Sequence, residues 1–330
     1  MTFVQSSSCG ACMLSMKTLR SLPMSKAHNG DDAEALTDVI ADPVASAALL
    51  GRLTRRLGLS GPWHRPLRGS ALLAIGEGEV LKVMAPGDAA MSAIEVSCLR
   101  RLEGALPVAT PRVLDAGVVA GWPYLRMTRL PGLELTETWN ALTHAAQLSL
   151  ATQLGEVLAI LHGTAAPLEV PRLDWPAWRA QQLGVLDATQ SAKGCPPPLL
   201  SGLRDFVAQQ PLEAGRTAWL HTEIMREHLL VQETPAGWRL SGLFDFEPSW
   251  VAPVDYEFAS VGLFFSAGDA RLLREVQRSA GVSIAPERLF ALAMLHRYAN
   301  LNWYHRRLGG PPNHAALAAA WFGCTPAVLG

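Results

Sequence analysis

The segment from His221 to Val231 has the residue types and spacing of a loop that could carry out phosphoryl transfer. In loops of the form HxDxxxxN, a carboxylate orients the attacking hydroxyl, and the residue five positions later supplies a metal ligand. Here Glu223 occupies the carboxylate position and His228 the metal-ligand position. Asp245, which follows an apolar segment, is the candidate for a second metal ligand, because a carboxylate at the end of a buried strand is costly without a cation.

The two residue exchanges in this loop keep a carboxylate and a metal-capable side chain but change how far these groups extend from the backbone. Glutamate carries its carboxylate about one methylene further out than aspartate, and a misplacement of about 1 Å can cost on the order of a hundredfold in rate. The loop must therefore be shifted, or activity is weak. Neutral imidazole at His228 can bind a divalent cation, although it suits Mn²⁺ or Zn²⁺ better than Mg²⁺. Alternatives for His228 are a packed histidine beside Leu229 and an imidazolium that contacts a phosphate. Glu247 is a second candidate for contact with metal or substrate.

A lysine near the end of a predicted strand could bind the phosphates of a nucleotide. Lys82 follows Val80-Leu81, and Glu95 lies thirteen residues later on a predicted helix, where it can hold the ammonium in place. The alternative is a solvent-facing lysine and a surface glutamate; Glu103 is a competing partner but lies at the helix end. Gly69-Ser70 precedes the first strand, and small residues there would let backbone amides approach an anion, although a plain turn fits as well.

The elements that position these residues change in character along the chain. Apolar spacing predicts helices in 32–57 with a break at Pro43, strands at 70–75, 80–84, 112–118 and 123–130, and a helix at 89–102. After Pro131-Gly132 the pattern is mostly helical. The predicted helices there are 147–162, 175–186, 199–209, 255–266, 270–280, 286–307 and 315–322, with short strands at 228–232 and 238–245. This order predicts an α+β, bilobal protein: residues 33–130 form a small lobe with an antiparallel sheet, and residues 131–330 form a larger helical lobe. Residues 1–32 are expected to be a disordered leader.

Composition excludes several classes of protein. The chain has 28 Lys plus Arg against 29 Asp plus Glu, so its overall charge would not attract nucleic acid or an anionic membrane. Its apolar runs are too short to cross a bilayer, so no membrane association is expected. The five scattered cysteines are typical of a reduced, cytoplasmic protein. Oligomeric state is left open.

The ordered set of motifs resembles the aminoglycoside phosphotransferase family, relatives of protein and choline kinases. The resemblance extends from Gly69 to Ala259 and includes VLKVM, ExxxLxxL, PYLRMTRLPG, HxExxxxH, GLFDFE and DYEFA. It implies a protein-kinase-like fold and ATP- and Mg²⁺-dependent transfer of the γ-phosphoryl group, with Mn²⁺ as a possible alternative metal. The acceptor would be a hydroxyl of a small molecule, either an aminoglycoside-like antibiotic, as in antibiotic resistance, or a metabolite. By the same resemblance Met127 borders the adenine, the backbone of Thr128 and Leu130 hydrogen-bonds it, and Glu257 supports the catalytic loop.

Two further predictions concern contact with the substrate and loss of catalysis. Asn300 and Tyr304 lie at i and i+4 of the predicted helix 286–307 and could face a substrate, but a core face with capping polar groups explains them equally well. The exchanges at Glu223 and His228 also leave open a nucleotide-binding pseudokinase or interaction module without phosphotransfer. Because both exchanges retain a carboxylate and a metal-capable side chain, an active enzyme with shifted geometry is favoured.

Overall fold

The structure is a computed structural model, and it describes residues 39, 42–66 and 71–323. The predicted leader (1–32) and the predicted phosphate-binding loop at Gly69-Ser70 lie outside these residues.

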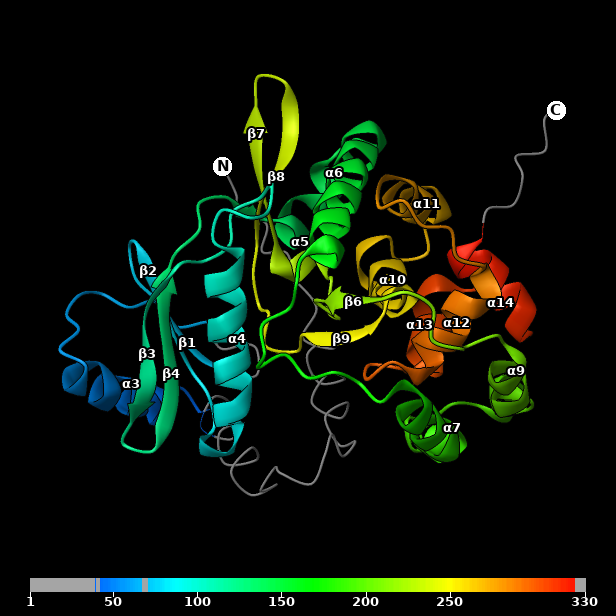
Figure 1. The fold of residues 1–330 in the computed structure, drawn as a ribbon, viewed down its shortest axis with the longest axis horizontal. Coiled ribbons are helices and arrows are strands. Elements are labelled where there is room, and N and C mark those ends of the chain that lie inside the picture. The colour runs from blue at the N-terminus through cyan, green and yellow to red at the C-terminus, as the bar shows by residue number, and fades with distance from the viewer. Residues whose placement is uncertain (1–38, 40–41, 67–70, 324–330) are drawn as a thin grey trace, which may run out of the picture.

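Between residues 42 and 128, as far as the structure describes them, the chain forms a four-stranded antiparallel sheet with two α-helices (Figure 1). Its strand order is β1-β2-β4-β3. The elements are β1 (Leu72–Ile75), β2 (Glu79–Val83), β3 (Val113–Val119), β4 (Trp122–Thr128), α3 (Pro43–Arg56) and α4 (Ala89–Leu102). Helix α4 packs on β3 and β4, whereas α3 packs on β1. Because β2 lies between β1 and β4, a residue on β2 is surrounded by sheet and can be held rigidly.

Two helix ends show how local sequence sets these boundaries. Pro43 is the first residue of α3, where a missing N–H costs nothing, and the predicted break lies just before it, because Val39 is helical and Asp42 is not. Asp42 caps that helix, since its carboxylate accepts from the backbone amides of Val44 and Ala45. Helix α4 ends with Arg100 and Arg101 in its last turn, where cations complement the helix dipole.

The second part of the chain is mainly helical (Figure 1). Its α-helices are α5 (Leu135–Thr138), α6 (His144–Gly163), α7 (Trp175–Ala192), α8 (Pro197–Leu200), α9 (Leu203–Gln209), α10 (Glu257–Ser260), α11 (Ala270–Ser279), α12 (Pro286–Leu295), α13 (Leu301–Leu308) and α14 (His314–Phe322). Short 3₁₀ or π turns are η3 (Pro86–Asp88), η4 (Trp139–Ala141), η5 (Arg226–His228), η6 (Val254–Tyr256) and η7 (Val261–Phe265). Helix α6 is its central helix, since it packs against α11, β6 and β8.

Two small sheets hold the loops of this part. The first has the order β5-β7-β8, and the second pairs β6 with β9. Their strands are β5 (Leu133–Glu134), β6 (Thr217–Leu220), β7 (Leu229–Thr234), β8 (Gly237–Leu243) and β9 (Trp250–Pro253). The β7–β8 hairpin places the end of β8 beside the start of β7, because Leu229 pairs with Leu243. This register brings the segments before β7 and after β8 together.

The predicted α+β, bilobal fold is confirmed, and the sheet strands and helix 89–102 lie close to their predicted positions. Three helix predictions are wrong. The predicted helix 199–209 is interrupted at Ser201 and Gly202, between α8 and α9, and Gly202 has φ 74°. The segment 255–266 is a 3₁₀ turn, one α-helical turn and a π turn rather than one helix. The predicted helix 286–307 is two helices, because His296 leaves the helical conformation with ψ 150° and Asn300 caps the second helix, α13. Strands β6 and β9 were not predicted.

Within the described residues, no helix is long and apolar enough to span a membrane.

Candidate active site

Lys82 is buried on the central strand β2 and binds three carboxylates. It is 4% exposed. Its Nζ lies 2.7 Å from Oε2 of Glu95, 2.6 Å from Oδ1 of Asp245 and 2.6 Å from Oε2 of Glu247. Glu95 comes from α4, whereas the other two follow β8 in the second lobe. The predicted pairing of Lys82 with Glu95 is therefore present in the structure, and the same ammonium links the two lobes.

One ammonium among three carboxylates leaves this cluster short of positive charge. Burial lowers the pKa of Lys82, but the three carboxylates outweigh it and hold that pKa well above its usual value. Burial raises the pKa of Glu95 to about 7 and also raises the pKa of Glu247, against the attraction of Lys82. Burial would likewise raise the pKa of Asp245, but Lys82 and His228 hold it well below its usual range. Three carboxylates compete for one ammonium, so the cluster has a physical reason to bind further cations.

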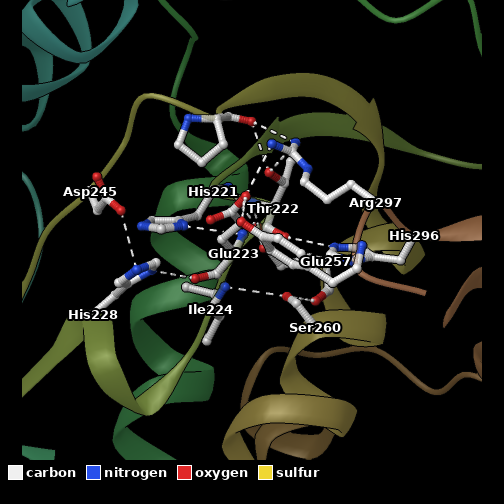
Figure 2. A network of polar contacts seen from close by, with 12 residues as sticks. His221, Thr222, Glu223, Ile224, His228, Asp245, Glu257, Ser260, His296 and Arg297 are labelled. Carbon is white, nitrogen blue, oxygen red and sulfur yellow. Dashed lines mark hydrogen bonds and ion pairs between the residues drawn. The ribbon is translucent and has the colours of Figure 1, made fainter. Parts of the chain in front are cut away.

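Asp245 and His228 face one another across the β7–β8 junction (Figure 2). Nε2 of His228 lies 3.2 Å from Oδ2 of Asp245. Nδ1 of His228 donates to the backbone oxygen of Glu223 at 2.8 Å, which fixes the ring and directs Nε2 toward Asp245. Asp245 has φ 70°, a left-handed conformation that aspartate and asparagine tolerate better than most residues.

These residues fit a divalent cation. Ligand atoms of Glu223, His228 and Asp245 all lie within 4.8 Å of one another, and so do those of Glu95, Asp245 and Glu247. Two carboxylates and an imidazole suit Mn²⁺ well, whereas the carboxylates alone suit Mg²⁺. Burial opposes the charged form of His228, but Asp245 and Glu223 outweigh it and raise the pKa of His228. A cation at this place would therefore compete with a proton on Nε2.

The backbone of the loop at His221–Glu223 is held by one buried carboxylate. Oε2 of Glu257 accepts from the amide of His221 at 2.7 Å, and Oε1 accepts from the amide of Thr222 at 2.8 Å. Ser260, one turn later on α10, accepts from the amide of Ile224 at 3.3 Å. Thr222 has φ 68°, an uncommon conformation for a β-branched residue, so these contacts hold the backbone in a strained turn. Glu257 thus lies under the loop, where the family resemblance places it.

His221 has a structural position. Its Nδ1 accepts from the amide of Glu223 at 3.3 Å, and its Nε2 lies 3.0 Å from the backbone oxygen of Phe244, to which it donates. Burial lowers its pKa, with a further contribution from the charge of His228. A neutral ring that uses both nitrogens ties the loop to the end of β8.

The side chain of Glu223 is held by two residues that the sequence did not indicate. Its Oε1 accepts from Oη of Tyr298 at 2.9 Å and lies 3.1 Å from Nη1 of Arg297. Both come from the break between α12 and α13, and Figure 2 shows Arg297 reaching the loop. The sequence signal that could have located the break is Asn300 before Leu301, since asparagine ahead of an apolar helical run is a typical N-cap.

The residues predicted around the adenine lie on β4 or just after it. Met127 is 7% exposed and pairs with Val80. The amide of Thr128 donates to the backbone oxygen of Arg112 at 2.9 Å, so a backbone contact of Thr128 with adenine would use its carbonyl oxygen, and that contact stays a prediction. Leu130 is partly buried and lies after the strand.

Asn300 and Tyr304 have structural positions rather than a shared helical face toward a substrate. Asn300 lies outside α13 as its N-cap, where its side chain accepts from the amide of Trp303 at 3.0 Å. Tyr304 is 1% exposed and donates to the backbone oxygen of Tyr298 at 2.7 Å. The prediction that both lie on one continuous helix is wrong, because the helix is broken at 296–300.

Comparisons with known proteins agree with this fold. The model of a family described as "Phosphotransferase enzyme family" matches residues 73–292, more than half of the chain. No curated protein sequence matches the chain.

Several solved structures have a similar fold. One is the GDP complex of a mutant of aminoglycoside 2′-phosphotransferase-IIIa, which is 16% identical with a TM-score of 0.64 over 78% of this chain and 89% of that chain. The GDP and kanamycin complex of APH(2″)-IIIa is 18% identical with a TM-score of 0.60 over 75% and 88% of the two chains. The apoenzyme of macrolide 2′-phosphotransferase MphH from Brachybacterium faecium is 20% identical with a TM-score of 0.57 over 84% and 99%.

Proposed function

This chain belongs to the phosphotransferase enzyme family, and from that membership we propose that it transfers the γ-phosphoryl group of ATP to a hydroxyl of a small molecule. Such transfer requires positioning and charge stabilisation more than covalent chemistry, so the arrangement of charges is the relevant test.

Each group of the site has a role in this proposal. Lys82, held by Glu95, binds the phosphates of ATP. Asp245 and His228 hold a divalent cation, which when bound neutralises charge on the phosphates. Glu223 accepts a hydrogen bond from the acceptor hydroxyl and orients its oxygen toward the γ-phosphorus. Glu247 shares the ammonium of Lys82 in the structure, and in this proposal it becomes available for a cation once Lys82 moves to the phosphates.

One observation carries the proposal: the residues are joined in a single chain of contacts. Lys82 binds Asp245, Asp245 faces His228, and His228 bonds the backbone of Glu223. A nucleotide-binding group, a cation-binding pair and an acceptor-binding carboxylate therefore lie next to one another, although they come from distant parts of the sequence.

The acceptor is proposed as an aminoglycoside-like antibiotic or another hydroxylated metabolite. Similar structures include both aminoglycoside and macrolide phosphotransferases, so the chemical class of acceptor is broad among them. The guanidinium of Arg297 lies directly against Glu223, which reduces the negative charge available to a polycationic acceptor at that point. Neutral hydroxylated compounds therefore belong in the acceptor panel beside the amines.

The test is turnover of ATP with Mg²⁺ or Mn²⁺ over that panel, with Asp245→Asn as the control. Asparagine has the same shape as aspartate and tolerates φ 70°, so this variant removes the charge without disturbing the turn. We expect at least a hundredfold loss of turnover. Turnover equal to that of the wild type would overturn the assignment, and ATP binding without turnover on any acceptor would favour a pseudokinase.

Dependence on ATP also suggests where the protein acts. Cys98 and Cys195 are buried free thiols, which fits the reducing cytoplasm where ATP is plentiful.

A further inference from the structure

The break between α12 and α13 places two side chains against Glu223. Helix α12 ends at Leu295 and α13 begins at Leu301. A continuous helix would have distributed residues 296–300 around its surface. His296 is extended and Asn300 is also outside the helical conformation, so the chain instead passes beside the loop at Thr222 and Glu223. His296 fixes this approach, because its Nε2 donates to the backbone oxygen of Thr222 at 3.1 Å.

We propose that Arg297 and Tyr298 form a clamp that positions the carboxylate of Glu223 for the acceptor hydroxyl. The proposal deepens the proposed function and rests on it. Both contacts, at 2.9 Å from the phenol and 3.1 Å from the guanidinium, fall on the same oxygen, Oε1. Among the described residues no hydrogen bond to Oε2 is found, so that oxygen is left to accept from a substrate.

A clamp is needed because the side chain is a glutamate. The extra methylene adds one rotatable bond, and an unrestrained carboxylate would occupy several positions about 1 Å or more apart. Two donors on one oxygen restrict both the chain and the rotation of the carboxylate plane, which leaves one position for the other oxygen. The clamp therefore compensates for the exchange of aspartate for glutamate at this place in the loop.

The clamp is itself held firmly. Nη2 of Arg297 donates to Oγ1 of Thr222 at 3.0 Å, and the guanidinium carbon lies 4.7 Å from the centre of the Trp250 ring. The backbone oxygen of Tyr298 accepts from Oη of Tyr304 at 2.7 Å. These contacts come from the loop itself, β9 and α13, so the two donors cannot follow Glu223 if it moves.

Ala299, the residue after Tyr298, is held by helix α7 and the residue that follows it. The backbone oxygen of Ala299 accepts from Nε2 of Gln190, on α7, at 3.3 Å and from Nζ of Lys193, just after that helix, at 2.6 Å. Oε1 of Gln190 in turn accepts from the amide of Leu301 at 2.8 Å, at the start of α13. The end of α7 thus fixes the far side of the break, and the geometry of Arg297 and Tyr298 is set by the loop, β9, α13 and α7 together.

The first test is Tyr298→Phe, which removes one donor and keeps the ring. We expect kcat to fall about tenfold, while KM for ATP stays within about twofold, because the phosphate-binding residues are untouched. The matched control is Tyr124→Phe, which removes a phenol bonded to Asp115 at 2.8 Å on the first lobe and should leave kcat unchanged. A kcat unaffected by Tyr298→Phe would overturn the clamp, and so would an increase in KM for ATP as large as the fall in kcat.

A double-mutant cycle separates positioning from a structural role. In the Glu223→Asp background the shorter carboxylate no longer reaches the phenol, so Tyr298→Phe should change kcat by less than about twofold. An equal loss in both backgrounds would show that Tyr298 acts independently of Glu223 and would overturn the proposal. If Glu223→Asp has no turnover, the cycle is read from thermal unfolding of the four proteins, where additive shifts in Tm would overturn it. Absence of turnover in the wild type would overturn the proposed function instead, so the two failures are distinct.

Discussion

The two sides of the candidate site are held together by different kinds of contact. On the nucleotide side (Lys82, Glu95, Asp245, Glu247), side chains bind other side chains through charge. On the acceptor side (His221–Glu223, Glu257, His296–Tyr298), side chains mostly bind backbone groups or are tied to the loop that carries them. The first arrangement depends on the number of charges present, and the second depends on the path of the chain.

The difference indicates which side can respond to a ligand. Ion pairs among flexible side chains can be exchanged for phosphates and cations, because the incoming charges replace those that are lost. Hydrogen bonds to buried amides cannot be exchanged in this way, since an unpaired amide costs about 1–3 kcal/mol. We therefore expect the nucleotide side to rearrange on binding and the acceptor side to remain fixed.

The largest effect is expected from Lys82→Met, which breaks the nucleotide side. Methionine keeps the length of the side chain but leaves three buried carboxylates without their cation. Removing one partner of a buried ion pair typically lowers the free energy of unfolding by about 3–5 kcal/mol, and turnover should fall at least a hundredfold. Urea unfolding and ATP turnover measure the two effects.

The control for this change is the same substitution at Lys193, which holds the backbone next to the acceptor side. Lys193 bonds only the backbone oxygen of Ala299 among the described contacts, and burial lowers its pKa to about 8. Lys193→Met should cost about 1 kcal/mol. If both lysine substitutions lowered the free energy of unfolding equally, the two sides of the site would be held by the same kind of contact.

Glu257→Ala should remove the hydrogen bonds that hold the acceptor side. This leaves the amides of His221 and Thr222 buried and unpaired, so the free energy of unfolding should fall by about 3 kcal/mol. Glu257→Gln keeps one carbonyl oxygen and should cost about half as much. Chemical denaturation of the three proteins gives the comparison, and a loss in the glutamine variant as large as in the alanine variant would point to charge rather than hydrogen bonding.

A smaller effect is expected from Asn300→Ala, which removes the cap of α13. An N-cap contributes about 1 kcal/mol, and here its loss should also loosen the clamp and lower kcat. Asn313 caps α14 with the same geometry, accepting from the amide of Ala316 at 3.0 Å. Asn313→Ala should cost a similar free energy of unfolding and leave kcat unchanged. A fall in kcat in both variants would contradict the proposed role of the α12–α13 break in positioning Glu223.

The smallest effect is expected from Ala120→Gly, far from both sides. Ala120 and Gly121 join β3 to β4 with φ 53° and 85°, a two-residue turn in which alanine is strained. Glycine should raise the free energy of unfolding by about 0.5 kcal/mol without altering turnover. Thermal unfolding and a turnover assay check this, and a change in KM for ATP would show that the hairpin affects Lys82.

The sequence predicted the nucleotide side more completely than the acceptor side. Lys82 and Glu95 are thirteen residues apart on a strand and the following helix, so local patterns placed both. Arg297 and Tyr298 are about 75 residues from Glu223, and no periodicity reports a contact over that separation. Strands β6 and β9 were missed because they are short and largely buried on both faces, so they lack the alternation that identifies a strand.

The left-handed backbone at Asp245 places two separate demands on that position. The carboxylate is what a cation needs, whereas the turn accepts aspartate, asparagine or glycine with least strain. A relative that no longer catalysed the reaction would not need the carboxylate, but the left-handed turn would still favour one of these three residues. Asparagine or glycine at position 245 would therefore identify, from sequence alone, a relative that has kept the fold and lost the reaction.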